Sequence, residues 1–257
     1  MLGHLPRPEW SIFLFFEIWV GRWGLVAASL THMPDPIYVK EAFARIADRY
    51  VMTNHVLSLG VDVWWRRVVT RRIKALSPTK VLDVASGTGD LALSIQDALP
   101  NAEVIATDFC AEMLGHASNR GVHQTLVADA LALPFPDGEF DVVTVAFGLR
   151  NMADYVRALK EMRRVLKPGG TLFILDFSLP QGVMRVPYRL YLHHVLPKLA
   201  GFLTKQKDAY EYLAGSIEQF PSGDAMISLL NHSGYGNSTV IPMTFGVVSV
   251  YEAVRKD

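Results

Sequence analysis

The chain has 257 residues, which is enough for one α/β domain with a full core and some elaborations. Lys plus Arg number 25 and Asp plus Glu number 25, so the net charge is zero, which argues against a nucleic-acid partner. A single cysteine, Cys110, excludes an intramolecular disulfide framework and is typical of a reducing compartment. Half of the residues are hydrophobic, which indicates a lipid-like ligand or a location close to a membrane.

Residues 1–35 form an apolar N-terminal extension of uncertain status. Glu17 and Arg22 interrupt it, so no charge-free stretch reaches the ~18 residues of a transmembrane helix. A secretory signal would need a basic start and a small-residue cleavage site, and both are poorly matched. Two interpretations stay open: the extension is a membrane-surface anchor, or translation begins at Met33 and residues 1–32 are not part of the protein.

Helices are predicted between residues 36 and 76, at the start of a domain that we expect to span 36–257. The segment from Val61 to Leu76 combines two tryptophans with a series of arginines and a lysine. Such a helix is typical of a solvated face beside a packed one. Its composition also suits contact with anionic lipid headgroups, so both interpretations stay open.

From Lys80 onward, strands and helices alternate, which predicts an α/β fold with a parallel sheet covered on both faces. The expected strands are 80–84, 103–107, 124–127, 140–146 and 171–177. The expected helices are 89–98, 110–117, 153–166 and 222–233, the third closed by Pro168-Gly169-Gly170. Alternating segments at 237–243 and 246–254 predict an antiparallel closing pair.

An aromatic-rich insertion at about 178–221 separates the last of the parallel strands from the helix at 222–233. Long insertions at the carboxyl end of such a sheet are often functional lids. We therefore expect a helical cap that covers a substrate and offers a path for an apolar tail. An ordinary helical cap with core aromatics is the alternative.

The run from Val81 to Ala92 is the most informative stretch, because an apolar strand enters a tight glycine turn and a helix begins at once. Gly87 and Gly89 let the backbone approach a ligand at the carboxyl end of the strand. The next strand ends in Asp108, 21 residues after Gly87, where a carboxylate can bind both hydroxyls of a nucleotide ribose. The pattern predicts an adenosine-type cofactor.

Asp90 bears on which cofactor is bound. A dinucleotide places its pyrophosphate on the free N–H groups at this helix start, where an acidic side chain would repel it. Leu91 and Ala92 also stand where a third glycine of the dinucleotide motif would lie. S-adenosylmethionine, which has a cationic end and no phosphate, suits the turn better. A nicotinamide-dependent oxidoreductase and a non-catalytic cofactor-binding scaffold are the alternatives.

Several motifs together resemble the menaquinone/ubiquinone biosynthesis C-methyltransferase family, within the class I methyltransferases, over about residues 36–255. They are the glycine turn at 81–90, Ala128-Asp129-Ala130-Leu131-Ala132-Leu133-Pro134-Phe135, Phe147-Gly148-Leu149-Arg150-Asn151, Arg164-Val165-Leu166-Lys167-Pro168-Gly169-Gly170, Asp176-Phe177-Ser178, Tyr212-Leu213-Ala214-Gly215-Ser216-Ile217 and Gly246-Val247-Val248. The resemblance implies a Rossmann-like sheet of seven mostly parallel strands with helices on both faces. It also implies S-adenosylmethionine as cofactor.

The resemblance further implies cofactor contacts at Thr88, Asp108, Asp129 and Ala130, with the Asp129 side chain near the adenine amino group. Two positions depart from the family pattern. Ala146 stands where relatives often carry a serine, so a hydroxyl contact to the cofactor is lost. Val51 stands where relatives often carry an aspartate, which leaves the proton acceptor less well defined.

The implied reaction is carbon methylation of a polyprenylated quinol, with demethylmenaquinol as the acceptor and 2-polyprenyl-6-methoxy-1,4-benzoquinol as the alternative. Arg150 follows strand 140–146, and we expect its permanent charge to bind the developing quinolate. Asn151 and Asn54 would orient the acceptor, and Tyr50 would pack on the ring or hydrogen-bond to it. A structural ion pair with Asp176 is the competing role for Arg150.

The partner that we expect is the polyprenyl quinol itself, with no nucleic acid. Adjacent histidines at 193 and 194 point to different faces of a helix and have no third ligand at metal spacing, so we expect no metal. Peripheral membrane contact and a homodimer stay open. We expect a cytoplasmic location, with contact at the inner face of the plasma membrane as a further option.

Overall fold

The computed structural model describes residues 60–195 and 207–257. The predictions for residues 1–59, including the roles of Tyr50 and Asn54, lie outside this part of the chain. The described residues begin with helix α3 (Val61–Ala75), as the pattern of tryptophans and basic residues predicts. Trp65, Val69 and Ile73 form its buried face, while Trp64 is about half exposed.

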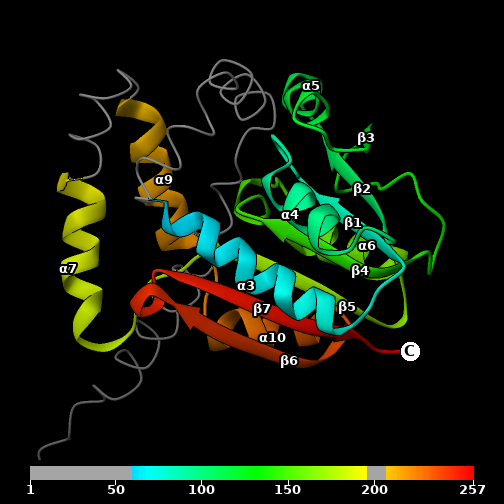
Figure 1. Ribbon diagram of the computed structural model, residues 1–257. Coiled ribbons are helices and arrows are strands. Elements are labelled where there is room, and N and C mark those ends of the chain that lie inside the picture. The colour runs from blue at the N-terminus through cyan, green and yellow to red at the C-terminus, as the bar shows by residue number, and fades with distance from the viewer. Residues whose placement is uncertain (1–59, 196–206) are drawn as a thin grey trace, which may run out of the picture. The chain divides into compact units, whose positions relative to one another are not determined.

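A seven-stranded sheet forms the centre, in the order β3-β2-β1-β4-β5-β7-β6 (Figure 1). Its strands are β1 (Lys80–Val84), β2 (Glu103–Asp108), β3 (Gln124–Val127), β4 (Phe140–Ala146), β5 (Leu166–Phe177), β6 (Tyr235–Met243) and β7 (Val248–Arg255). Neighbours among β1 to β5 run parallel, and β7 runs antiparallel to both β5 and β6. The predicted fold class and the antiparallel closing pair are confirmed.

Helices cover both faces of the sheet because successive side chains of a strand point to opposite sides. Val81 of β1 packs in one core cluster with α3 and α4 (Asp90–Ala98). Leu82 and Val84 pack in the other cluster with α6 (Tyr155–Val165) and α10 (Asp224–His232). Helix α5 (Ala111–Asn119) connects β2 to β3 and contributes Ala117 to the first cluster.

The junction between α6 and β5 differs from the prediction. The sequence favoured a helix up to residue 166 and a strand from 171, but α6 ends at Val165 and β5 begins at Leu166. Leu166 already pairs with Phe140, and the β4–β5 register shifts between Phe140 and Val142. Gly169, at a φ of 75°, lies inside this irregular start of β5. The Pro-Gly-Gly run therefore bends a strand as well as following a helix.

The segment after β5 is helical on both sides of the undescribed residues 196–206. It contains η2 (Gly182–Met184), α7 (Arg185–Leu190), the π-helical turn η3 (Tyr191–Val195) and α9 (Lys207–Gln219). Tyr188 and Leu192 are buried in a small cluster with Ala214 and Ile217 of α9. Whether this segment acts as a cap over a substrate stays a prediction. Within residues 60–195 and 207–257, the helices are too short or too polar to cross a bilayer.

Candidate active site

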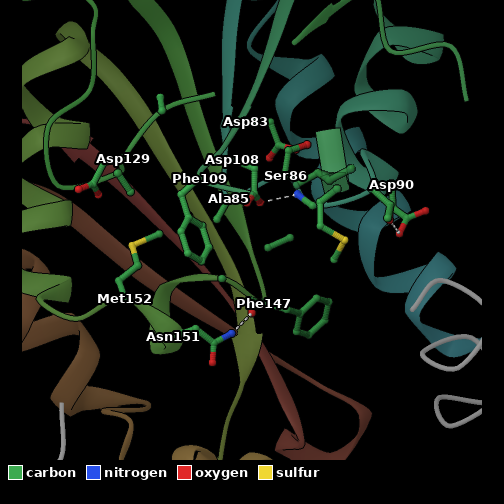
Figure 2. Close-up of a pocket in the computed structure, with 18 of the residues that line it drawn as sticks. Asp83, Ala85, Ser86, Asp90, Asp108, Phe109, Asp129, Phe147, Asn151 and Met152 are labelled. Atoms are coloured by element: carbon green, nitrogen blue, oxygen red, sulfur yellow. Dashed lines mark hydrogen bonds between the residues drawn. The ribbon is translucent and has the colours of Figure 1, made fainter. Parts of the chain in front are cut away.

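A cavity of about 450 Å³ opens at the carboxyl ends of the central strands. The turn after β1, the loops after β2 and β3 and the residues after β4 supply its walls (Figure 2). The chain passes from β1 to β2 on one side and returns to β4 on the other side of β1. Such a reversal leaves a crevice at the strand ends, which is where α/β proteins bind nucleotide ligands.

Two glycines shape the turn after β1 for different reasons. A Cβ atom on Gly89 would lie 2.6 Å from Val122 Cγ2 and 3.0 Å from the Ala117 side chain, so α4 starts against the end of α5 only if residue 89 has no side chain. A Cβ on Gly87 would meet nothing closer than 4.0 Å, but its φ of 57° favours glycine. Gly87 thus leaves open space beside the turn, whereas Gly89 lets α4 pack closely against the end of α5.

Asp108 at the end of β2 is held by backbone groups and is only 7% exposed. Its Oδ2 atom accepts from the Gly87 N–H at 2.8 Å, and its Oδ1 atom accepts from the Cys110 N–H at 2.9 Å. Burial raises the pKa of this carboxyl, and the backbone hydrogen bonds oppose that shift. Each oxygen keeps a second lone pair, so the carboxylate can still accept from two hydroxyls in the cavity.

Asp83 within β1 is a buried acid of the site that the sequence analysis missed. Its oxygens accept from Ser86 Oγ and from Thr144 Oγ1, each at 2.6 Å. Burial raises the pKa of the Asp83 carboxyl to about 6, while these two hydrogen bonds work in the opposite direction. The available signal was an acidic residue inside an otherwise apolar strand, because such a group is rarely buried without a purpose.

Asp90 lies in the first turn of α4, but its charge is shared with two arginines. Its Oδ1 atom is 2.7 Å from Arg120 Nη2, and its Oδ2 atom is 3.6 Å from Arg66 Nη2. Arg66 also pairs with Asp62 one turn earlier on α3, and it lines the cavity. Asp90 therefore does not make this end of the cavity simply negative, and it excludes a phosphate less firmly than the sequence indicates.

The loop after β3 places Asp129 and Ala130 in the cavity wall. Asp129 is exposed, and its Oδ1 atom accepts from the Leu131 N–H at 2.8 Å. In Figure 2, Asp129 and Asp90 lie on opposite sides of the Asp108–Phe109 pair. The cavity can therefore accommodate an elongated ligand that extends from one carboxylate to the other.

Residues after β4 form the remaining wall. Phe147 has a φ of 57°, and its carbonyl accepts from Asn151 Nδ2 at 3.3 Å and from Arg150 Nη1 at 2.8 Å. Its ring packs against Phe177 with centroids 4.9 Å apart. Asn151 and Met152 reach the cavity together with Phe147 (Figure 2).

Arg150 makes a buried ion pair beside this wall and does not line the cavity. Its Nη1 atom is 2.6 Å from Asp176 Oδ1, with the two side chains 7% and 0% exposed. Its guanidinium carbon lies 5.2 Å from the centre of the Phe177 ring. Burial raises the pKa of Asp176, and the charge of Arg150 lowers it. Within the described chain, Arg150 Nε and Asp176 Oδ2 are buried without a hydrogen-bond partner.

The structure thus brings most of the predicted site residues together. The residues that line the cavity are Gly87, Thr88, Asp108, Asp129, Ala130 and Asn151. Gly89 lies just behind the turn, and Arg150 lies outside the cavity wall. Three further lining residues are not predictable from the sequence, because nothing in their spacing marks them: Arg66, Phe109 and Met152. Among the described residues, no cluster of three potential metal ligands occurs.

These residues fit S-adenosylmethionine. Asp108 has a fixed carboxylate that a ribose could donate to, the Gly87–Gly89 turn leaves room for a ligand beside the backbone, and Asp129 stands at the far end of the cavity. The strand order with its antiparallel β7 and the position of this cavity define a class I S-adenosylmethionine-dependent methyltransferase.

The chain belongs to the ubiE/COQ5 methyltransferase family, whose model matches residues 31–255. It is 44% identical over 219 residues to a demethylmenaquinone methyltransferase of Thermus thermophilus, covering 83% of this chain and 99% of the relative. It is 39% identical over 236 residues to the ubiquinone/menaquinone biosynthesis C-methyltransferase UbiE of Bdellovibrio bacteriovorus, covering 88% and 99%. The family resemblance expected from the motifs is confirmed.

Two solved structures support the fold alone. A methyltransferase of Thermotoga maritima superposes with a TM-score of 0.61 at 20% identity, covering 85% of this chain and 100% of that one. Phosphoethanolamine N-methyltransferase 2 of Haemonchus contortus, in complex with S-adenosyl-L-methionine, gives a TM-score of 0.57 at 14% identity, covering 84% and 60%.

The family membership and the two relatives together identify the protein as an S-adenosylmethionine-dependent C-methyltransferase of menaquinone or ubiquinone biosynthesis.

Proposed function

We propose that the enzyme methylates a ring carbon of a polyprenylated quinol, with demethylmenaquinol as the acceptor. The observation that carries this proposal is the identity of 44% and 42% with the demethylmenaquinone methyltransferases of Thermus thermophilus and Deinococcus radiodurans. The UbiE relatives, whose names include both ubiquinone and menaquinone, are 38 to 40% identical, and two further demethylmenaquinone methyltransferases, from Chlorobaculum species, are 38% identical. A 2-polyprenyl-6-methoxy-1,4-benzoquinol of ubiquinone synthesis is the alternative acceptor.

The cavity wall suits a flat ring. Phe109, Phe147 and Met152 supply apolar faces next to the strand ends, and Leu131 adds a further apolar side chain. Such walls exclude water and limit the orientations of the ring, which is how a methyl acceptor is brought to attack distance. When bound, S-adenosylmethionine supplies an electrophilic methyl group on a sulfonium.

The ring carbon becomes nucleophilic when a phenol-like hydroxyl loses its proton, and such hydroxyls titrate near ~10. With the cofactor bound, this carbon would take the methyl group while the sulfur keeps the electron pair of the broken sulfur–methyl bond, and the proton of the methylated carbon would pass to water. We assign Asn151 to hydrogen-bond the acceptor, since it lines the cavity. Arg150 lies behind the cavity wall and does not touch the acceptor, so we assign it to stabilise the quinolate oxygen by its charge across the wall or through a water, while Asp176 holds its guanidinium in place. The roles of Tyr50 and Asn54 stay predictions.

Methyl transfer to a synthetic demethylnaphthoquinol without a tail, under reducing conditions, tests the proposal. We expect S-adenosylhomocysteine and a singly C-methylated product in equal amounts by mass spectrometry. The matched benzoquinol should react more slowly, and the oxidised naphthoquinone should not react, because it has no ionisable hydroxyl. A faster benzoquinol reaction would reassign the acceptor, and no product from either quinol would reject the proposed function.

Calorimetric titration with S-adenosylmethionine and with NADH distinguishes a methyltransferase from a nicotinamide-dependent oxidoreductase. We expect heat only with S-adenosylmethionine. Binding without turnover on either quinol would favour the non-catalytic scaffold.

A further inference from the structure

The turn η2 and the helix α7 that follows it expose a row of apolar side chains within the described part of the chain. Val183 of η2 is 89% exposed, and Val186 and Leu190 of α7 are 65% and 53% exposed. Their spacing of three and four residues places them on one side of this continuous helical segment. The opposite side holds Tyr188 and Leu192, which are buried against α9. Small proteins seldom expose several large apolar side chains together, so this face calls for a partner. We name Val183, Met184, Val186 and Leu190 the α7 surface.

The sequence that contains the α7 surface is rich in basic residues. From Ser178 to Lys207 the sequence contains no Asp or Glu, while its basic residues are Arg185, Arg189, Lys198, Lys205 and Lys207. Arg185 lies on α7 and is exposed. Arg189 donates through Nε to Glu218 of α9 at 2.7 Å, which leaves the rest of its guanidinium on the surface. An apolar face bordered by cations complements an anionic lipid headgroup layer.

A further exposed apolar residue, Phe245, lies near the start of the helical segment that follows β5. Phe245 is 81% exposed at the tip of η4 (Thr244–Gly246). The carbonyl of Gly246 accepts from Ser178 Oγ at 2.8 Å, and the Ser178 N–H donates to Val247 O, so this tip is attached to the start of the helical segment. Figure 1 shows α7 at the side of the described chain that bears α9, away from the edge strand β3.

We infer that the α7 surface docks the enzyme on the anionic face of a phospholipid bilayer. The inference rests on the proposed function, because a polyprenyl tail keeps the quinol in the bilayer and the methyl acceptor must be taken from there. Apolar side chains of α7 enter the headgroup boundary, and Arg185 and Arg189 meet lipid phosphates. The helical segment after β5 would then lie between the bilayer and the catalytic domain, so the quinol would have a short path from the lipid to the cavity.

Helix α3 is the competing surface, because its sequence pattern also suits lipid contact. It exposes Trp64 and Val63, 49% and 37% accessible, next to Arg67 and Arg71. Each helix pairs one arginine with a glutamate, Arg72 with Glu252 at 2.6 Å and Arg189 with Glu218 at 2.7 Å, but the apolar exposure of α3 is smaller than that of the α7 surface. We therefore assign the docking role to α7 and use α3 as the comparison.

Vesicle sedimentation of the full chain tests the assignment, with phosphatidylcholine vesicles and vesicles that contain one quarter phosphatidylglycerol. We expect binding to the anionic vesicles that weakens with added salt. The double variant Val183→Glu/Val186→Glu should lose at least tenfold in partitioning, and Arg185→Glu should lose several-fold. The matched variants Trp64→Glu on α3 and Val156→Glu on α6, the latter at a residue 37% exposed, should bind like the wild type.

Three outcomes would overturn the inference: equal binding to both vesicle types, unchanged binding of the double variant, or loss of binding only with Trp64→Glu. The wild type could instead fail to bind vesicles while the double variant has a lower oligomeric mass by light scattering. That result would assign the α7 surface to contact with a second copy of the chain.

All variants are also assayed for methyl transfer to the tail-less naphthoquinol, which needs no membrane. Retained transfer with lost vesicle binding is the expected result and shows that the variants fold. Vesicle binding as predicted with no quinol methylation by the wild type would reject the proposed function and leave the docking surface standing.

Discussion

The two sides of the cavity are built by different means. On the cofactor side, Asp108 is fixed by two backbone N–H groups, and Gly89 is fixed by the packing of α4 against α5. On the side that we propose for the acceptor, the wall after β4 depends on one buried ion pair, Arg150 with Asp176, and on aromatic contacts of Phe147. The cofactor side is therefore a property of the fold, whereas the acceptor side depends on individual side chains that can be exchanged.

The largest expected effect comes from breaking the buried pair. Arg150→Met should lower the free energy of unfolding by about 3–5 kcal/mol, because it leaves the Asp176 carboxylate buried without a cation. Turnover should fall by about two orders of magnitude or more, while affinity for S-adenosylmethionine changes little. Chemical denaturation, single-turnover assays and calorimetry measure the three quantities.

The double variant Arg150→Met/Asp176→Leu separates the two roles of Arg150. Replacing both partners with apolar side chains should restore most of the stability, because no unpaired charge remains. If Arg150 acts on the quinolate, turnover stays low in this variant. Recovery of turnover together with stability would show that the pair is purely structural.

The next effect concerns the pH dependence of stability through Asp83. Its pKa is raised from 3.8 to about 6, so the folded protein holds this proton more tightly than the unfolded chain. The contribution of Asp83 to stability is then largest below about pH 4 and is lost as the pH rises through about 6. Relative to Asp83→Asn, which does not titrate, the wild type should lose about 2–3 kcal/mol between those limits.

Urea unfolding of both proteins across this pH range checks the expectation. Thr144→Val removes a hydrogen bond that lowers the pKa of Asp83, so it should move the midpoint to higher pH. A difference between wild type and Asp83→Asn that does not vary with pH would contradict the assignment.

The smallest effects compare the two carboxylates at the cofactor side. Asp108→Asn should weaken binding of S-adenosylhomocysteine about 10- to 100-fold, or about 1.5–3 kcal/mol, since its amide cannot serve both backbone donors and the ligand. Asp129→Asn should cost only about 1 kcal/mol, because this side chain is exposed to water. Calorimetric titration gives both values, and a larger loss at Asp129 would reverse the assignment of the ribose and adenine ends.

The sequence predicted the sheet well because its information is local. Strands such as β1 and β4 are short apolar runs bounded by glycine or acidic residues, and their positions agree with the prediction. The start of β5 was missed because Leu166 becomes a strand residue only through pairing with Phe140, which is distant in sequence.

The same limit applies to the site. Gly87 and Asp108 could be predicted because their spacing follows from one strand–helix–strand unit. The neutralisation of Asp90 could not, because Arg120 comes from the end of another helix and Arg66 from a helix before the sheet. The pairing of Arg150 with Asp176 was anticipated only as an alternative, since sequence spacing does not tell whether a cation faces a ligand or a carboxylate.

The placement of β7 between β5 and β6 has a consequence for biosynthesis. While a ribosome elongates the chain, β6 emerges before the strand that joins it to the sheet, and the free edge of β5 stays unpaired until residues 248–255 appear. A nascent chain halted between these two strands would display an open strand edge prone to aggregation.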